Sequence, residues 1–159
     1  IPSWAADATV TIDGRPLDGA VPDRAAARPT ASGLDPRQAR WCRIDLPEGP
    51  CEVGLTLPLE VRLLAQDRRV PKVGGAVAVA RGPLLYCLEG VDHPGLDHLA
   101  LSDLVLDTAS VTARFDPELL GGAVAVEGRT VDGRALRFVP YFLWGNRGPG
   151  GMTAFIRVR

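Results

Sequence analysis

The stretch EVGLTLPLEVRL, from Glu52 to Leu63, alternates between apolar residues and other types at every step. Because successive side chains of a β-strand point to opposite faces, this alternation predicts a long strand with one buried face. Pro58 has no N–H to donate to a neighbouring strand, so we expect the strand to lie at a sheet edge or to be bulged there. The apolar positions expected on the buried face are Val53, Leu55, Leu57, Leu59, Val61 and Leu63.

Shorter β-prone runs, separated by turn-forming residues, occur along the rest of the chain. They cover Thr9–Ile12, Trp41–Leu46, Ala76–Ala80, Leu84–Leu88, Ser110–Phe115, Ala123–Val126, Ala135–Val139 and Thr153–Val158. Helical periodicity is nearly absent, although Asp116–Leu120 is expected to form one helical turn. Several strands at such spacing, without intervening helices, predict an all-β fold, specifically an antiparallel β-sandwich.

Hairpin turns are predicted at three places. Asp13-Gly14 and Asp132-Gly133 each lie between β-prone runs, and the positive φ angles of a tight hairpin turn suit an Asp-Gly pair. A third hairpin is predicted where Trp41–Leu46 and the long strand flank the turn Pro47–Pro50. Such hairpins agree with the antiparallel arrangement.

Length and composition are those of one soluble globular domain. The chain has 159 residues, of which 46% are hydrophobic and 23% are charged, and at this length about 68–70% of the unfolded surface should be buried. We expect a single domain over residues 1–159, with an irregular loop at 13–38. No run approaches the roughly 18 apolar residues of a membrane span, and the net charge of −1 with dispersed arginines argues against a nucleic-acid surface. No signal peptide is visible, and a cytoplasmic location is favoured over export.

The three cysteines, Cys42, Cys51 and Cys87, show no spacing typical of a metal site. Two alternatives remain for Cys42 and Cys51: a disulfide across the turn between their strands, or free thiols. The apolar surroundings in the sequence favour reduced, structural cysteines.

Glu89 is the best single candidate for an acidic functional residue. It ends a β-prone run, and a carboxylate beside Arg81 would form a structural ion pair or a ligand contact. A glycosidase needs two carboxylates, about 5–5.5 Å apart for retention and about 6.5–9.5 Å apart for inversion. Nothing in the sequence requires such a pair, so the structural role is favoured for Glu89.

Two Asp-His pairs, Asp92-His93 and Asp97-His98, look like parts of a metal site. Both lie in an irregular segment rich in Pro and Gly, where ligand geometry would be poorly fixed. A solvated loop is therefore the favoured interpretation of both pairs.

Aromatic residues raise the alternative of sugar binding, since their flat faces can stack on a sugar. The candidates are Trp4, Trp41, Tyr86, Tyr141 and Trp144. Packing in a core or an interdomain contact is favoured for most of them. For Trp144 both sugar binding and packing stay open, because Gly145, Asn146 and Arg147 follow it and the chain must turn there. Arg147 is expected to stack on an aromatic ring or to pair with a carboxylate, bracing the fold or contacting another domain.

Three segments in order resemble one family. They are IPSWA at Ile1–Ala5, VAVARGPLLYCLE at Val77–Glu89 and PYFLWGNRGPGGM at Pro140–Met152. Their order and spacing are similar to the C-terminal region of glycoside hydrolase family 127, which includes β-L-arabinofuranosidases. The chain begins inside the first of these motifs, so we expect it to be a fragment that lacks an N-terminal strand and all that precedes it.

The resemblance implies that catalysis belongs to a different part of the protein. Family members use a cysteine nucleophile beside a zinc site of cysteines and a glutamate, in an (α/α)6 barrel that precedes the region matched here. No adjacent Cys-Cys pair exists in this chain, and no catalytic residue of the family maps onto it. We therefore expect no catalytic residue, metal or other cofactor in this segment, with zinc only in the barrel.

The resemblance also suggests partners and a topology. The expected partners are the barrel of the same protein and a plant-type, arabinose-containing glycan, with no nucleic acid or membrane. The last strand, at 153–158, is expected to return to the sheet of the first half, leaving about 91–139 as an insertion. Residues proposed for substrate or interdomain contact are Trp144, Asn146, Arg147, Trp4, Arg81 and Glu89. The alternative is a free-standing carbohydrate-binding or structural β-sandwich module.

Overall fold

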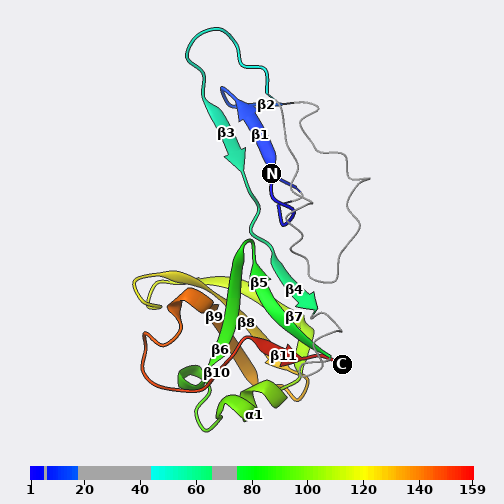
Figure 1. Cartoon of the computed structure of the whole chain (residues 1–159), viewed down its shortest axis with the longest axis vertical. Helices are drawn as coiled ribbons and strands as arrows, with labels where there is room; N and C mark the ends of the chain where they lie inside the picture. Colours follow the sequence, from blue (N-terminus) through cyan, green and yellow to red (C-terminus); the bar gives the residue numbers. More distant parts are fainter. Residues whose placement is uncertain (6, 18–43, 66–74) are drawn as a thin grey trace. The chain divides into compact units, whose positions relative to one another are not determined.

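The computed structural model describes residues 1–5, 7–17, 44–65 and 75–159. The chain divides into two compact units, Ile1–Glu60 and Val61–Arg159, called unit 1 and unit 2 below (Figure 1). The prediction of a single domain did not anticipate this division.

Unit 1 contains a small antiparallel sheet in the order β2-β1-β3. Its strands are β1 (Thr9–Ile12), β2 (Arg15–Pro16) and β3 (Val53–Thr56). Asp13 and Gly14 join β1 to β2 with φ angles of 49° and 75°, the combination that a two-residue hairpin turn requires. The Asp13 carboxylate also accepts a hydrogen bond from the Glu52 backbone N–H at 2.9 Å. The first predicted hairpin is confirmed.

The predicted long strand from Glu52 to Leu63 is wrong as a single element. It is broken at 57–60, so that β3 belongs to unit 1 and β4 (Val61–Ala65) to unit 2. Pro58 lies in the break, where its missing N–H interrupts strand pairing. Val61 and Leu63 pack against the core of unit 2, whereas Val53, Leu55 and Leu59 are exposed rather than buried.

The third predicted hairpin is also absent from the described residues. Residues 44–46 form no strand, and β3 pairs with β1 instead. Trp41 and Cys42 lie outside the part of the chain that the structure describes.

Unit 2 is built on one antiparallel sheet in the order β11-β5-β6-β9-β8-β7, with β4 added to β5 and β10 added to β6 (Figure 1). The strands besides β4 are β5 (Ala76–Arg81), β6 (Leu84–Glu89), β7 (Leu106–Asp116), β8 (Ala123–Thr130), β9 (Ala135–Pro140), β10 (Met152–Thr153) and β11 (Phe155–Arg157). The sheet curls until β4 and β7 contact each other. The predicted all-β, antiparallel class is confirmed.

In the described part of unit 2, helical structure is limited to short segments. They are α1 (His98–Asp103) and the 3-10 turns η4 (Gly90–Asp92) and η5 (Tyr141–Leu143). No helix in the described part of the chain is long and apolar enough to cross a membrane. The helical turn expected at Asp116–Leu120 is not formed: Asp116 ends β7, and residues 117–120 form turns in which Leu119 is buried.

The last strands enter a gap in the middle of the sheet. β5 and β6 pair only beside their connecting turn, through Ala80 with Leu85 and Arg81 with Leu84. Farther from the turn the two strands separate, and the returning chain fills the space, with β10 paired to β6 and β11 paired to β5. This closing segment therefore joins the two parts of the curled sheet.

Residues 91–139, expected from the resemblance to be an insertion, form an integral part of the sheet. They supply β7, β8 and nearly all of β9, and β9 pairs directly with β6. The Asp132-Gly133 pair connects β8 to β9, as predicted, with Gly133 at a φ of 89°. The main core is formed jointly by this segment and the strands that flank it. Its buried residues are Val77, Val79, Tyr86, Leu88, Leu101, Leu106, Val126, Leu136, Phe138 and Ile156.

Candidate functional site

The turn that follows β9 presents three aromatic side chains to solvent. Tyr141, Phe142 and Trp144 are all exposed, and we call residues 141–144 the aromatic turn. The Trp144 N–H donates to the Tyr141 carbonyl at 3.1 Å, which closes η5. The side-chain amide of Asn146 donates to the Leu143 carbonyl at 3.1 Å. These local bonds fix the backbone that carries the aromatics.

A buried group of charges holds the other end of this turn. Arg147 donates through Nη1 to Asp92 Oδ1 at 2.8 Å and through Nη2 to Asp92 Oδ2 at 2.5 Å, a bidentate contact. Nη2 also pairs with Glu89 Oε2, while Glu89 Oε1 accepts from the Gly145 N–H at 2.9 Å. We call Glu89, Asp92 and Arg147 the arginine cluster. It joins the end of β6 and η4 to the segment after the aromatic turn.

Burial makes the arginine cluster costly to disrupt. The side chains of Glu89, Asp92 and Arg147 are only 5%, 11% and 17% exposed. Hydrogen bonds from Arg147 to Asp92, and then to Glu89, raise the pKa of the guanidinium above its ordinary value. Two carboxylates share one guanidinium here, so loss of the guanidinium would leave both without their cationic partner.

His93 connects the same region to the sheet. Its Nδ1 lies 2.7 Å from the Glu89 carbonyl oxygen, and its Nε2 accepts the Arg137 backbone N–H at 3.2 Å. This pattern requires the neutral ring with its proton on Nδ1. Both ring nitrogens are therefore engaged in holding η4 against β9.

Cys87 is buried beside the arginine cluster and is unsuited to nucleophilic chemistry. Burial, followed by the negative charge of Glu89, raises the pKa of its thiol to about 12. The thiolate is the reactive form of cysteine. Cys87 packs with Leu119, Ala125 and Val139, so its role is that of a small apolar residue.

We expect Cys51 and Cys87 to differ in thiol reactivity, and the difference to be measurable in a Cys42→Ser variant. At about pH 8, near the ordinary thiol pKa of ~8.5, Cys51 should react with a chromogenic disulfide reagent in the folded protein, because it is partly exposed and free. Cys87 is also free but buried, and should react only after denaturant is added. Rapid reaction of two thiols without denaturant would contradict the described burial.

Gly151 shows how closely the chain after the aromatic turn is packed. Its carbonyl accepts the Gly90 N–H at 2.8 Å, and a Cβ at this position would lie 2.6 Å from the His98 backbone nitrogen. The backbone of α1 cannot move aside as a flexible side chain would. Only glycine fits here without displacing the start of α1.

We predict that Gly151→Ala lowers the free energy of unfolding by about 1–3 kcal/mol, as overpacking does elsewhere. Gly150→Ala is the matched control, because its Cβ would meet nothing closer than 3.7 Å. That change should be nearly neutral or slightly stabilising through the unfolded chain. Urea denaturation of both variants measures the difference, and equal stability of the two would refute the close approach.

Comparisons with known proteins agree with this architecture. Residues 61–157 match the model of the glycoside hydrolase family 127 C-terminal domain. The chain belongs to glycoside hydrolase family 127. A non-reducing end β-L-arabinofuranosidase from Bifidobacterium longum subsp. longum is 31% identical over 180 aligned residues, which include 99% of this chain and 25% of that protein.

Solved structures of family 127 proteins share the fold. A family 127 β-L-arabinofuranosidase from Geobacillus stearothermophilus T6 matches with a TM-score of 0.73 and 30% identity, over 100% of this chain and 26% of its own. A further β-arabinofuranosidase of the family matches with a TM-score of 0.61 and 19% identity, over 96% of this chain and 23% of its own, a likeness of fold alone. The chain thus spans about a quarter of the length of these relatives.

Four of the six residues proposed from the sequence come together. Glu89 and Arg147 form the arginine cluster with Asp92. Trp144 and Asn146 lie in the short segment just before Arg147, whose backbone Glu89 holds at Gly145. The preference for a structural role of Glu89 agrees with this arrangement, although its cationic partner is Arg147.

Arg81 and Trp4 do not join this group. Arg81 lies beside Tyr86, whose pKa is raised by burial and lowered in part by the Arg81 charge. Tyr86 in turn donates its hydroxyl to the Val124 carbonyl at 3.0 Å. Trp4 belongs to unit 1 and is partly buried there.

The solvated-loop interpretation was wrong for Asp92 and His93. Both are turned inward by η4, which the Gly90 N–H fastens to Gly151, and His93 is fully buried. Asp97 and His98 are exposed as expected, but they begin a helix rather than lie in a loop: Asp97 caps α1 by accepting the Ala100 N–H at 2.8 Å, and His98 is its first residue. Within the described residues, no three side chains of His, Cys, Asp or Glu are gathered as ligands for a metal.

Proposed function

We propose that this chain is the non-catalytic C-terminal domain of a longer hydrolase that acts on β-L-arabinofuranosides. The observation that carries the proposal is the match of residues 61–157 to the C-terminal domain of family 127. The relatives named as β-L-arabinofuranosidases are about four times as long as this chain. Their remaining length leaves room for a separate catalytic domain, where the zinc implied by the family resemblance would be bound.

The chemistry of the buried polar groups supports a non-catalytic role. Glycoside hydrolysis commonly requires one carboxyl group that donates a proton and one that attacks or activates water. Glu89 and Asp92 instead both accept hydrogen bonds from Arg147. The thiol of Cys87, with a pKa raised to about 12, is equally unsuited to act as a nucleophile. Glu89, Asp92 and Arg147 instead brace the aromatic turn.

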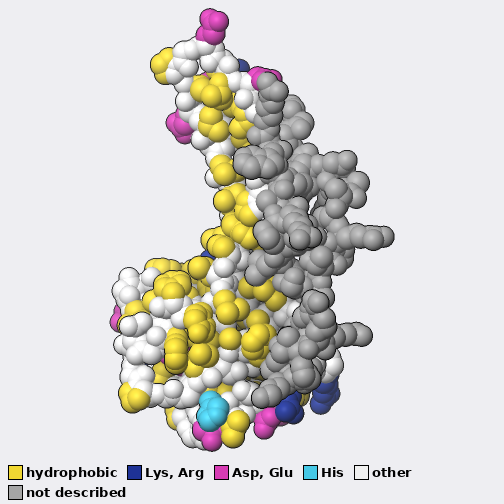
Figure 2. Space-filling view, in the orientation of Figure 1, with side chains coloured by type: hydrophobic (Ala, Val, Ile, Leu, Met, Phe, Trp, Pro, Cys, Tyr) yellow, Lys and Arg dark blue, Asp and Glu magenta, His cyan; other side chains and the backbone are white. Residues whose placement is uncertain are grey.

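The aromatic turn is the proposed contact with the rest of the same protein. Tyr141, Phe142 and Trp144 are exposed together on a backbone fixed by the arginine cluster. Hydrophobic side chains also gather on the face of unit 2 shown in Figure 2. Aromatic residues are enriched in the buried centres of interfaces, where rigid side chains lose little entropy on binding.

A carbohydrate-binding surface is the second candidate for the same aromatics. The Tyr141 and Trp144 ring centroids lie 6.1 Å apart, and the ring planes are tilted by 32°. A row of coplanar rings would favour stacking on an extended glycan, and these rings are not coplanar. The geometry therefore favours a protein contact over a glycan platform.

An assay of the 159-residue chain with 4-nitrophenyl β-L-arabinofuranoside tests the non-catalytic role. No release of nitrophenol above the buffer blank is expected. Hydrolysis that co-purifies with the chain and is abolished by Glu89→Gln would overturn the proposal. A spectrum that shows whether the variant is folded must accompany the assay, because Glu89 also braces the turn.

A further inference from the structure

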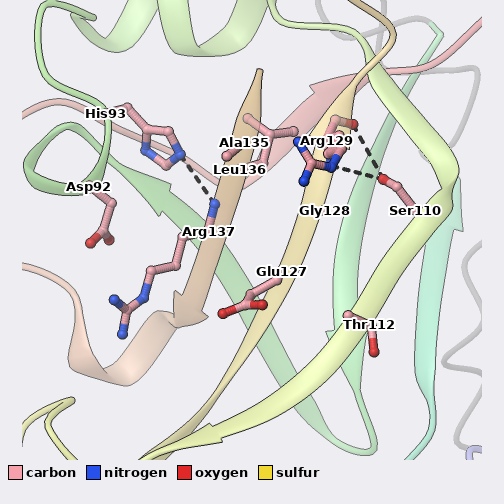
Figure 3. A pocket seen from close by; sticks show the side chains of 10 residues that line it. All are labelled: Asp92, His93, Ser110, Thr112, Glu127, Gly128, Arg129, Ala135, Leu136 and Arg137. Carbon is pink, nitrogen blue, oxygen red and sulfur yellow. Dashed lines mark hydrogen bonds between the residues drawn. The ribbon is translucent and has the colours of Figure 1, made fainter. Parts of the chain in front are cut away.

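A polar pocket of about 450 Å³ lies on the solvent-facing side of β7, β8 and β9 (Figure 3). Its lining comes from these strands and from η4 with the residue that follows it. The lining residues are Asp92, His93, Ser110, Thr112, Glu127, Gly128, Arg129, Ala135, Leu136 and Arg137. The volume falls in the range of about 300–1,000 Å³ that is typical of small-molecule sites.

Strand register builds the floor of this pocket. Thr112 is paired with Glu127, and Glu127 with Arg137, so that three polar side chains follow one another across three strands (Figure 3). Arg129 and Ala135 form a neighbouring pair. Because partners in register lie on one face of a sheet, the row presents hydroxyl, carboxylate and guanidinium groups together.

A bulge in β7 shapes one wall. The register between β7 and β8 shifts between Asp107 and Thr112, which pushes β7 outward. Ser110 fixes the bulge, since its hydroxyl donates to the Asp107 carbonyl at 2.7 Å and accepts the Arg129 N–H at 2.8 Å. Bulges of this kind are over-represented beside functional sites, where they redirect side chains.

The side chains of the opposite wall are also held in place, by hydrogen bonds and ion pairs. His93 is held at both ring nitrogens, and Asp92 is bound by Arg147. Arg137 is anchored by an ion pair with Asp116, and its Nε finds no acceptor among the described residues. The walls are therefore set by bonds that do not involve a ligand.

The lining favours a neutral ligand with several hydroxyl groups. Two carboxylates, Asp92 and Glu127, are balanced by two guanidiniums, Arg129 and Arg137, so neither an anion nor a cation is preferred. The ion pair described for Glu127, with Arg114, is long at 3.8 Å, and both side chains are exposed. The carboxylate oxygens of Glu127 are thus available to accept hydrogen bonds from a ligand. Among the described residues, no Phe, Tyr or Trp side chain lines the pocket, which disfavours flat apolar ligands.

We propose that this pocket binds a neutral sugar of about monosaccharide size, with Glu127 accepting from adjacent hydroxyl groups and Thr112 contributing a further hydrogen bond. Such binding is independent of the aromatic turn and does not require that the longer protein hydrolyse arabinofuranosides.

A heteronuclear NMR titration of the 159-residue chain with L-arabinose tests the proposal. Saturable shifts are expected at the backbone amides of Ser110, Thr112, Gly128 and Arg129, with a Kd of the order of 1 mM, as suits a small polar ligand. Glu127→Ala should weaken binding by about tenfold or more, the loss of roughly 1.4 kcal/mol. Arg114→Ala is the matched control, because Arg114 pairs with Glu127 but does not line the pocket, and it should leave the Kd unchanged.

Three outcomes would overturn the proposal. They are the absence of saturable shifts at these amides, equal affinity in Glu127→Ala and the unmodified chain, and equal shifts with the acyclic polyol D-mannitol. Thr112→Val provides a second variant on a different strand should Glu127→Ala fold poorly. Hydrolysis assays do not enter this test, so its failure is distinguishable from failure of the proposed function.

Discussion

Replacing Arg147 with Met should destabilise the chain by about 3–5 kcal/mol, the usual cost of removing one partner from a buried ion pair. Methionine retains much of the side-chain volume, so the loss comes mainly from charge. Glu89 and Asp92 would remain almost fully buried without their guanidinium. The measurement is the free energy of unfolding from urea denaturation, followed by circular dichroism.

Arg157→Met is the matched control for this prediction. Arg157 pairs with Asp103 at 2.9 Å, but both side chains are well exposed, and exposed ion pairs contribute about 0–1 kcal/mol. Adding Glu89→Gln and Asp92→Asn to Arg147→Met should restore part of the stability, because the buried negative charges are removed. The arginine cluster would lose its proposed role if Arg147→Met and Arg157→Met were equally stable.

Replacing Phe138 with Ala should cost about 3–5 kcal/mol, as is usual when a large aromatic is removed from a core. Phe138 lies on β9, is 3% exposed and packs in the main core. It also pairs with Leu88 of β6 and Val126 of β8. The variant therefore tests whether β9 is a central strand of the fold.

Phe115→Ala offers a control in the same part of the chain. Phe115 lies on β7 and is 62% exposed, so its removal should change the free energy of unfolding by about 0.5 kcal/mol or less. Comparable losses in the two variants would mean that residues 91–139 behave as a peripheral insertion, contrary to the described core.

Local chemistry explains which elements could be predicted from the sequence. The hairpin at Asp13-Gly14 requires two positive φ angles, a demand that this dipeptide meets by itself. Strands such as β5 and β8 are recognised because β-prone residues recur between clear turn signals. Neither prediction depends on distant parts of the chain.

Pairing between distant segments explains the errors. The alternation in Glu52–Leu63 predicts extended backbone but does not show that β3 and β4 enter different sheets on either side of Pro58. Likewise, the sequence of 91–139 contains no signal that β9 pairs with β6. Strand partners are selected by packing of the whole sheet, which periodicity alone does not reveal.

The candidate site was predicted only in part for a similar reason. Glu89 and Arg147 stood out through the motifs that contain them, whereas Asp92 and His93 occur in a short polar segment with Pro and Gly neighbours. Such a segment looks the same whether it is solvated or turned inward. The partner that buries Asp92 lies 55 residues away, and the spacing of Glu89 and Asp92 across one turn was the available clue.

Hydroxyl-radical footprinting of the aromatic turn tests the proposed accessory role most directly. Oxidation rates of Tyr141, Phe142 and Trp144 would be compared between the 159-residue chain and the complete protein produced from the same gene. Phe115 provides the internal reference, because its exposure of 62% is close to the 64% of Phe142. The proposal predicts that the three aromatics become protected in the complete protein while Phe115 does not. Unchanged oxidation of all three in the complete protein would contradict a contact between this turn and the rest of the hydrolase.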